Sequence, residues 1–504
     1  MLASVATFAI EGVGSREVTV EVDVRRGLPT FTLVGLPDRA VREARERVRA
    51  ALLNSRLDFP QQRLTVNLAP AHVHKAGPGF DLAIAVGLLG ATGQVPEEPL
   101  GSCAVYGELS LSGELRPGRG ALAVALGARE AGYSRLAVAP DDAGEAALVP
   151  EVEVVAVESL EGIARLLRGE RAPQRASPRP PRVRSAAARL DLADVRGQED
   201  AKRALEIAAA GGHNMLMVGP PGAGKTMLAR RLPGILPPPS FEEALEITRI
   251  GGVAGLGDGG LVSERPFRAP HHTISPQGLI GGGMTPRPGE VTLAHRGVLF
   301  LDELAEFSRP ALDALRQPLE EGRVEVTRGQ RTIVFPARAM VVAATNPCPC
   351  GRAADACSCD AVLLGRYARR LSGPLLDRID LVCRLGPVAP VELVREGQDE
   401  GSSRRVRGRV LAARERQRRR LPGSAALCNG DMDGRLTRRT VRLGRRLRSR
   451  LASLADPNLL SGRGHDRVLR VARTIADLDE RDAVAERDLD EALAYRLGGV
   501  AAAA

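Results

Sequence analysis

One stretch of the chain has the residue types and spacing needed to hold the phosphates of a nucleotide. It follows the apolar run 215–218 and precedes a helix-like pattern over 227–232. Glycines let backbone N–H groups turn toward phosphate oxygens, the helix N-terminus adds its positive dipole end, and a lysine adds a charge. The following threonine offers a hydroxyl to Mg²⁺. This context predicts nucleotide binding rather than a plain turn. The stretch consists of Gly219, Pro220, Pro221, Gly222, Ala223, Gly224, Lys225 and Thr226.

Two adjacent acids follow the apolar run 298–301. A short, wholly apolar run is typical of a buried parallel strand, and an acid at its carboxyl end lies beside the phosphate loop. We therefore expect Asp302 to hold Mg²⁺ through water and Glu303 to orient or deprotonate the attacking water. The alternative is a helix start with two acids in its first turn. The phosphate loop upstream favours the catalytic interpretation.

Two more polar residues fit a hydrolytic site. Asn346 follows the apolar run 340–344, and a polar residue at that strand end reaches the γ-phosphate or the attacking water. Arg378 follows a proline-started helix in the segment 372–380. A ring ATPase needs an arginine from the adjacent subunit to offset transition-state charge, and Arg378 is the candidate. A lone arginine is otherwise more often a surface ion-pair partner.

Four cysteines form two C-x-C pairs separated by six residues: Cys348, Cys350, Cys357 and Cys359. Four thiolates in a dozen residues can close a tetrahedral Zn²⁺ site, although C-x-C is tighter than the usual C-x₂₋₄-C spacing. Free reduced thiols or a redox pair are the alternatives. Two adjacent histidines, His271 and His272, could also ligate a metal. Adjacent histidines are expected to point in different directions, so a structural or DNA-contacting loop is favoured over a shared metal.

Two insertions bear on what the protein acts upon. The first, 247–296, is glycine-rich with scattered arginines that include Arg268. The second, 323–335, alternates on both sides of a glycine as a β-hairpin would, with Arg328 and Arg331 at its tip. We take these three arginines as DNA-contact candidates. Spacing alone does not distinguish a loop that grips DNA from one that grips protein, or from a solvated hairpin.

The first third of the chain carries a different pattern. Alternating valines over 18–24 predict a half-buried strand, and helices are expected near 38–54, 81–90 and 121–131. The segments 75–86 and 107–117 resemble the Lon-type protease domain, which implies an α+β fold.

The Lon-type resemblance also implies where a Ser–Lys catalytic dyad would lie. The serine position falls at Gly79 and the lysine position at Val124, so we expect no peptidase activity. Lys75 and Ser112 are interpreted as a solvated loop lysine and a turn serine.

Composition limits the remaining possibilities. With 504 residues, two to four domains are expected. The net charge of +10 mildly favours a polyanionic partner, whereas an aromatic share of 3% without Trp argues against broad base-stacking platforms. No stretch resembles a signal peptide or approaches the ~18 apolar residues of a membrane span, so we expect a cytoplasmic protein without membrane contact.

We therefore expect a multidomain protein of α/β and α+β class. Residues 1–168 would form a catalytically inactive Lon-protease-like domain, and the Arg/Pro-rich stretch 169–190 a solvated linker. Residues 191–386 would form a P-loop core with a parallel sheet, and residues 387–504 a helical lid with an arginine-crowded helix over 404–420.

The chain as a whole resembles the YifB/ComM family of magnesium-chelatase-like AAA+ ATPases. The most specific strings are 267–275, 297–304, 344–351 and 372–380. The resemblance implies a homohexameric, ATP-driven motor that acts on branched or single-stranded DNA and promotes branch migration during recombination or natural transformation.

The resemblance also implies a lid arginine that reaches the γ-phosphate. Arg467 is the first choice for it, with Arg463 and Arg470 as rivals.

Two functions of other classes remain open. One is remodelling of proteins or metallocofactors, as in chelatase or unfoldase rings. The last hundred residues contain no DxSxS metal-adhesion pattern, which weakens a fused chelatase role. The other is a scaffold or switch that turns over ATP slowly.

Overall fold

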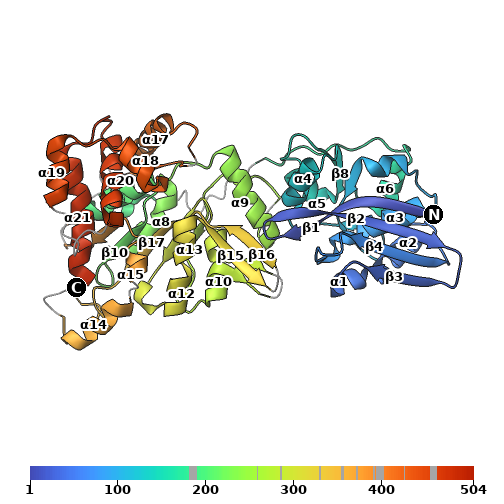
Figure 1. Cartoon of the computed structure of the whole chain (residues 1–504), viewed down its shortest axis with the longest axis horizontal. Coiled ribbons are helices and arrows are strands. Elements are labelled where there is room, and N and C mark those ends of the chain that lie inside the picture. Colours follow the sequence, from blue (N-terminus) through green and yellow to red (C-terminus); the bar gives the residue numbers. More distant parts are fainter. Residues whose placement is uncertain are drawn as a thin grey trace. The chain divides into compact units, whose positions relative to one another are not determined.

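The computed structural model describes residues 1–180, 190–257, 259–283, 286–328, 331–352, 357–370, 373–389, 392, 402–424, 426–453 and 462–503. The chain divides into two compact units (Figure 1). Unit 1 is Met1–Val183 with Ser240–Ser263, and unit 2 is Arg184–Pro239 with Glu264–Ala504. This division differs from the expected one, because the segment from Ser240 to Ser263 belongs with the N-terminal unit.

Unit 1 is built on two small sheets. In the first, of order β1-β2-β4-β3, only β3 and β4 run parallel. The second, of order β5-β8-β9, is wholly parallel, and β6 pairs with β7 as a short hairpin. The strands are β1 (Leu2–Glu11), β2 (Gly14–Arg25), β3 (Thr30–Val34), β4 (Arg63–Ala69), β5 (Cys103–Val105), β6 (Glu108–Leu109), β7 (Leu115–Arg116), β8 (Arg135–Val138) and β9 (Glu153–Ala156).

The helices of unit 1 cover these sheets. The alternation expected in β2 is confirmed, because Val18, Val20 and Val22 are fully buried. The helix α3 is apolar on all sides and lies buried between other elements, as such helices must. The helices are α1 (Arg39–Arg42), α2 (Ala44–Asn54), α3 (Asp81–Ala91), α4 (Ala121–Glu130), α5 (Pro140–Ala146), α6 (Leu160–Leu167) and α9 (Phe241–Ala254).

Part of the expected linker is not a solvated spacer. The backbone N–H of Ala176 donates to Val154 in β9 at 2.9 Å, and that of Arg179 donates to Gly144 in α5 at 3.1 Å. This stretch therefore lies along unit 1, because its peptide groups find partners at the sheet edge and on α5. Residues 181–189 of the linker lie outside the described residues.

Unit 2 contains a five-stranded parallel sheet of order β11-β14-β17-β10-β18. All six residues of β17 and all four of β14 are buried, which explains the apolar runs 340–344 and 298–301. Two antiparallel hairpins, β12–β13 and β15–β16, lie outside the sheet. The strands are β10 (Met215–Val218), β11 (Phe267–Arg268), β12 (Gly281–Gly282), β13 (Arg287–Pro288), β14 (Val298–Leu301), β15 (Arg323–Arg328), β16 (Arg331–Pro336), β17 (Met340–Thr345) and β18 (Leu381–Arg384).

The C-terminal helices share one hydrophobic core with this sheet. Val410 of α17 and Ile475 of α20 are buried in the same cluster as Met217 of β10. The helices of unit 2 are α7 (Glu199–Gly211), α8 (Lys225–Ile235), α10 (Pro276–Ile280), α11 (Glu290–Leu293), α12 (Arg309–Ala314), α13 (Arg316–Glu321), α14 (Ala361–Arg370), α15 (Gly373–Leu376), α17 (Ser403–Arg420), α18 (Gly434–Thr440), α19 (Arg445–Ser453), α20 (Gly462–Leu478) and α21 (Glu486–Ala503). Among the described residues, no helix is both long enough and apolar enough to cross a membrane.

Candidate active site

The phosphate loop lies between the end of β10 and the start of α8, as predicted. Gly224 caps α8 with φ +88°, a conformation that residues with a side chain rarely adopt. A Cβ at Gly219 would lie 2.7 Å from the carbonyl oxygen of Leu385. Both positions therefore require glycine, and the loop delivers the next two residues to the first turn of a helix.

Lys225 is held at the centre of the loop. Its Nζ donates to the carbonyl oxygens of Gly219 at 2.5 Å and Pro220 at 3.0 Å, and to Oδ1 of Asn346 at 3.0 Å. Burial lowers the pKa of the ammonium, whereas the nearby carboxylates of Asp302 and Glu303 raise it. The structure thus brings together the loop lysine and the polar residue at the end of β17.

Thr226 and Asp302 meet at the ends of α8 and β14. The threonine hydroxyl donates to Oδ2 of Asp302 at 2.7 Å. A hydroxyl and a carboxylate are hard oxygen ligands of the kind that Mg²⁺ takes together with phosphate oxygens. The donor set therefore fits the metal that this fold implies.

Glu303 has an unusual backbone and a partner that the sequence did not reveal. Its φ is +53°, and its side chain is 58% exposed. Nδ1 of His272 lies 3.2 Å from its Oε2. The expectation that the adjacent histidines point apart is wrong, because the His271 and His272 ring centroids are 4.1 Å apart. His272 comes from the loop after β11, which lies beside β14 in the sheet, and this neighbourhood depends on strand order.

Arg378 lies at the end of the α15 segment and is 8% exposed. Its guanidinium pairs with the carboxylate of Glu320 in the same chain. Arg463, one of the rival lid arginines, also donates to Glu320, at 2.9 Å. To act on a neighbouring subunit, Arg378 must exchange Glu320 for a phosphate.

Arg467 lies on α20 with its Nε 3.3 Å from Oδ1 of Asp380. Burial lowers the pKa of Arg467. Burial alone would raise the pKa of Asp380, but the hydrogen bond from His213 and the charges of Arg470 and Arg467 outweigh it and lower that pKa. Nη1 of Arg467 is buried without a hydrogen-bond partner among the described residues. By contrast, the rival Arg470 donates to the carbonyl oxygens of Gly430 and Met432 at 2.7 and 3.1 Å. Nε of Arg470 is also buried without a partner among the described residues, so Arg467 stays the first choice on the grounds of the sequence alone.

The DNA-contact candidates lie in two places. Arg268 ends β11 and forms a bidentate pair with Glu290, with N–O distances of 2.6 and 2.7 Å, which raises the pKa of the arginine. The expected hairpin is confirmed, with Arg328 paired opposite Arg331 in the β15–β16 register.

The four cysteines converge, as the zinc hypothesis requires. All four Sγ atoms lie within 4.8 Å of one another, and the thiols are free. Cys348 is 3% exposed and the others are half-buried. Burial raises the pKa of Cys348 to about 12, whereas the backbone N–H of Arg352 lowers that of Cys350 to about 6.

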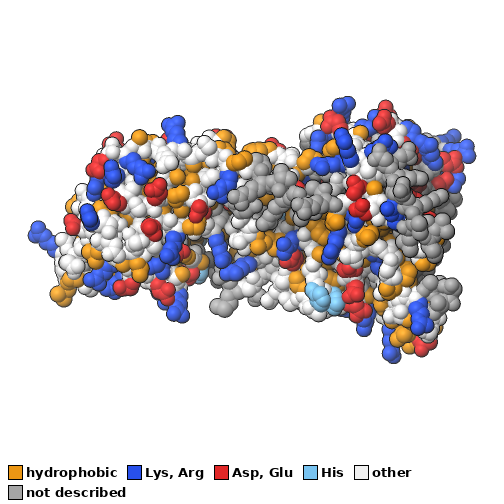
Figure 2. Space-filling view, turned by 180° about the vertical axis from the view of Figure 1, so that it is seen from behind, with side chains coloured by type: hydrophobic (Ala, Val, Ile, Leu, Met, Phe, Trp, Pro, Cys, Tyr) orange, Lys and Arg blue, Asp and Glu red, His pale blue; other side chains and the backbone are white. Residues whose placement is uncertain are grey.

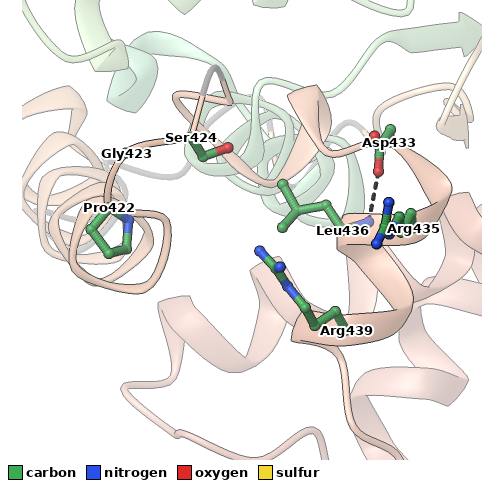
Figure 3. Close-up of a pocket in the computed structure, with 7 residues that line it drawn as sticks. All are labelled: Pro422, Gly423, Ser424, Asp433, Arg435, Leu436 and Arg439. Carbon is green, nitrogen blue, oxygen red and sulfur yellow. Dashed lines mark hydrogen bonds between the residues drawn. The ribbon is translucent and has the colours of Figure 1, made fainter.

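A hollow of about 400 Å³ lies in the helical part of unit 2. In Figure 3, Asp433 accepts from the backbone N–H of Leu436, at 2.6 Å, and Arg439 points into the space beside the 422–424 loop. None of the lining residues belongs to the phosphate loop or the strand ends, so the hollow is separate from the nucleotide site. It is lined by Pro422, Gly423, Ser424, Asp433, Arg435, Leu436 and Arg439.

The Lon-like positions of unit 1 do not assemble a dyad. A Cβ at Gly79 would lie 2.5 Å from the Tyr106 ring, and Val124 is fully buried. The expectation of a solvated Lys75 is wrong, because its side chain is fully buried and donates to the carbonyl of Pro70. Ser112 lies exposed in a turn, as expected.

Three family models match the chain. They are described as magnesium chelatase, subunit ChlI, over residues 191–393; subunit ChlI of Mg-chelatase, over 20–142; and magnesium chelatase, subunit ChlI C-terminal, over 400–496. Together they match regions in both units.

Curated relatives extend the match to almost the whole chain. The uncharacterized protein YifB of Salmonella typhimurium is 44% identical over 507 residues, covering 98% of this chain and 97% of YifB. The competence protein ComM of Haemophilus influenzae is 42% identical over 507 residues, with the same coverage of 98% and 97%. Lon protease 2 of Bacillus subtilis is 30% identical over 139 residues, which is 26% of this chain and 25% of that protein. The chain therefore belongs to the YifB/ComM family, with its magnesium-chelatase-like AAA+ architecture.

Proposed function

We propose that this protein hydrolyses ATP and uses the energy to translocate on branched or single-stranded DNA as a cytoplasmic homohexamer. The observation that carries the hydrolytic part is the convergence of functional groups at two strand ends. Lys225 donates to Asn346 at 3.0 Å, and Thr226 donates to Asp302 at 2.7 Å, with Glu303 directly after Asp302. Such positioning supplies most of the catalysis in phosphoryl transfer.

Each residue of the site has a distinct role in this proposal. The loop 219–224 and Lys225 bind the phosphates, and Thr226 and Asp302 hold Mg²⁺. When bound, the metal offsets charge on the β- and γ-phosphate oxygens. Glu303 orients or deprotonates the attacking water, and Asn346 orients the γ-phosphate or that water.

Two arginines complete the proposed site. Arg378 offsets transition-state charge in the adjacent subunit, which requires a ring, and Arg467 reaches the γ-phosphate from α20. In this role Arg378 leaves Glu320 of its own chain and contacts a phosphate bound by the adjacent subunit, so its position depends on that subunit.

DNA as the substrate, and branch migration as the process, are supported by indirect observations. A relative of matching length is named a competence protein. The chain has a net charge of +10, and Arg328 lies opposite Arg331 in the register of the β15–β16 hairpin. Basic and acidic side chains are interspersed on the face shown in Figure 2.

The test compares the ATPase rate of the full-length protein without nucleic acid and with single-stranded, duplex and four-way-junction DNA, beside a sizing measurement. We expect strong stimulation by DNA, falling steeply with salt, and a hexameric species. Glu303→Gln should bind ATP without turnover. Stimulation by unfolded protein instead of DNA would favour a protein remodeller, and slow turnover insensitive to both would favour a nucleotide-dependent scaffold.

A further inference from the structure

The four cysteines have the separations of a tetrahedral metal site. Zinc with Zn–S bonds of about 2.3 Å places its sulfur ligands about 3.8 Å apart. Here Sγ of Cys348 lies 3.2 Å from that of Cys350 and 3.6 Å from that of Cys357, and the Cys350 and Cys357 sulfurs are 3.8 Å apart. Cys359 completes the group within 4.8 Å. Four sulfur donors favour Zn²⁺ or iron over Mg²⁺ or Ca²⁺.

The cluster closes the loop that joins β17 to α14. Cys348 is two residues after Asn346, and Cys359 is two residues before the start of α14. The helix then returns to the strand end, because the Tyr367 hydroxyl lies 3.0 Å from Oγ1 of Thr345 and donates to the carbonyl of Asn346 at 3.1 Å. The helix that follows the loop therefore contacts the residue that pairs with Lys225.

The same loop rests on the phosphate loop. Gly351, between the two C-x-C pairs, has φ +70° and donates its N–H to the Cys348 carbonyl at 3.0 Å. A Cβ at Gly351 would lie 3.0 Å from Cγ of Pro221 and 3.8 Å from Nδ2 of Asn346. The glycine lets the cysteine loop approach Pro221 closely, so the position of one loop limits that of the other.

We propose that the four cysteines bind one Zn²⁺ ion, and that this ion fixes the cysteine loop against Pro221 and Asn346 so that the phosphate site is held ready for hydrolysis. The ion takes no part in the chemistry. By cross-linking the four cysteines it reduces the conformational entropy that is lost when the loop is held in one position. The metal site stands on the cysteines alone, whereas its effect on turnover rests on the proposed ATPase function.

The first measurement is the metal content of the full-length protein purified without chelators. We expect one zinc per chain, and loss of zinc in Cys348→Ser and Cys357→Ser. Cys103→Ala is the matched control, since Cys103 is also buried and free but belongs to β5 of unit 1. Circular dichroism and thermal unfolding establish that each variant is folded. Iron in place of zinc, or zinc retained by both serine variants, would overturn the metal assignment.

The second measurement separates metal binding from its effect on the nucleotide site. Gly351→Ala keeps all four thiols and adds a methyl group against Pro221. We expect it to retain zinc but lose turnover by about ten- to a hundred-fold, the cost of misplacing groups by about 1 Å. The cysteine variants should lose turnover similarly, and wild-type protein treated with a zinc chelator should recover when zinc is returned.

The possible failures are distinguishable. Wild-type protein that holds zinc but never hydrolyses ATP contradicts the proposed function and leaves the metal site established. Metal-free protein, or Gly351→Ala, with wild-type turnover contradicts the effect on hydrolysis. Zinc absent from the wild type contradicts the site itself.

Discussion

At the scale of residues, the active site depends on short hydrogen bonds between groups distant in sequence. Lys225 and Asn346 are 121 positions apart and meet at 3.0 Å, and Thr226 and Asp302 are 76 apart and meet at 2.7 Å. Glu303 carries a positive φ, which costs about 1–3 kcal/mol for such a residue and recurs at functional sites. The backbone strain therefore lies at the residue that is expected to activate water.

His272 should act as a positioning residue for Glu303. Its Nδ1 is 3.2 Å from the carboxylate, so His272→Ala leaves Glu303 without that partner. We expect kcat to fall about tenfold while the KM for ATP is unchanged, because the ring lies beside Glu303, which is outside the phosphate loop. His272→Gln, which keeps a donor, should recover part of the rate.

His271 supplies the matched control for this prediction. Its Nδ1 bonds with the Thr273 hydroxyl at 2.8 Å within its own loop. His271→Ala should affect kcat less than His272→Ala. Equal losses in both variants would mean that the loop, rather than the contact with Glu303, is what matters.

At the scale of elements, each functional group is placed by the end of a strand or the start of a helix. The sheet order β11-β14-β17-β10-β18 puts the carboxyl ends of β14, β17 and β10 side by side. Parallel strands present their C-terminal ends at one edge, where ligands of such folds bind. In unit 1, the start of helix α5 likewise places a carboxylate, that of Asp142, and this affects the stability of the unit.

Asp142 should make the stability of unit 1 dependent on pH. It is 8% exposed in the first turn of α5 and accepts from the backbone N–H of Gly118 at 2.7 Å. Burial raises its pKa to about 7, with Glu145 and Asp141 adding to the rise and the Gly118 hydrogen bond opposing it. The folded state thus binds this proton more tightly than the unfolded state. The contribution of Asp142 to the free energy of unfolding therefore falls as the pH rises from about 4 to 7.

Asp142→Asn removes that titration. Relative to wild type, the variant should gain about 2 kcal/mol of unfolding free energy between pH 5 and pH 8. The check is urea unfolding of both proteins at each pH, followed by a probe in unit 1. A difference between the two proteins that stays constant with pH would contradict the prediction.

The β15–β16 hairpin should couple ATP hydrolysis to DNA. Replacing Arg328 and Arg331 by alanine should remove most of the DNA stimulation and flatten its salt dependence while sparing basal turnover. The control is Arg323→Ala at the base of the same hairpin, where the arginine pairs with Glu321 and Glu325 at 3.1 Å each. DNA stimulation that survives the tip variant would assign the contact to other residues.

At the scale of the whole molecule, the chain leaves unit 2 after Pro239 and returns at Glu264. Between these points α9, capped by Ser240 and Glu243, packs on α4 in unit 1. A Cβ at Gly252 would lie 2.6 Å from Oε1 of Glu145, so a larger residue there would displace that carboxylate. The chain therefore passes between the two units three times, after Val183, after Pro239 and after Ser263.

A mixing experiment tests whether the active site is shared between subunits. Lys225→Ala and Arg378→Ala should each be inactive alone. Mixed in one ring, an Arg378→Ala subunit keeps its phosphate loop and receives Arg378 from a Lys225→Ala neighbour, so activity should partly return. If rings shown to contain both variants recover no ATPase activity, Arg378 does not act across the subunit boundary and only pairs with Glu320 of its own chain.

The sequence by itself determined the local chemistry of this protein. The glycine spacing of 219–224, the acids after 298–301 and the alternation around Gly329 each act through neighbours in the chain, so periodicity and turn chemistry suffice to predict them. The strand at β2, the helix at α3 and the β15–β16 hairpin were predicted on these grounds and are confirmed.

Only the tertiary structure decided the contacts that depend on strand order and burial. His272 meets Glu303 because β11 lies beside β14, and the fully buried Lys75 lies in a segment whose backbone bridges to Pro37. The transfer of α9 to unit 1 and the contact of Gly351 with Pro221 likewise arise between distant segments. Such contacts produce no regular pattern in the sequence. They depend on complementary shape and charge between distant segments, not on the spacing of residues along the chain.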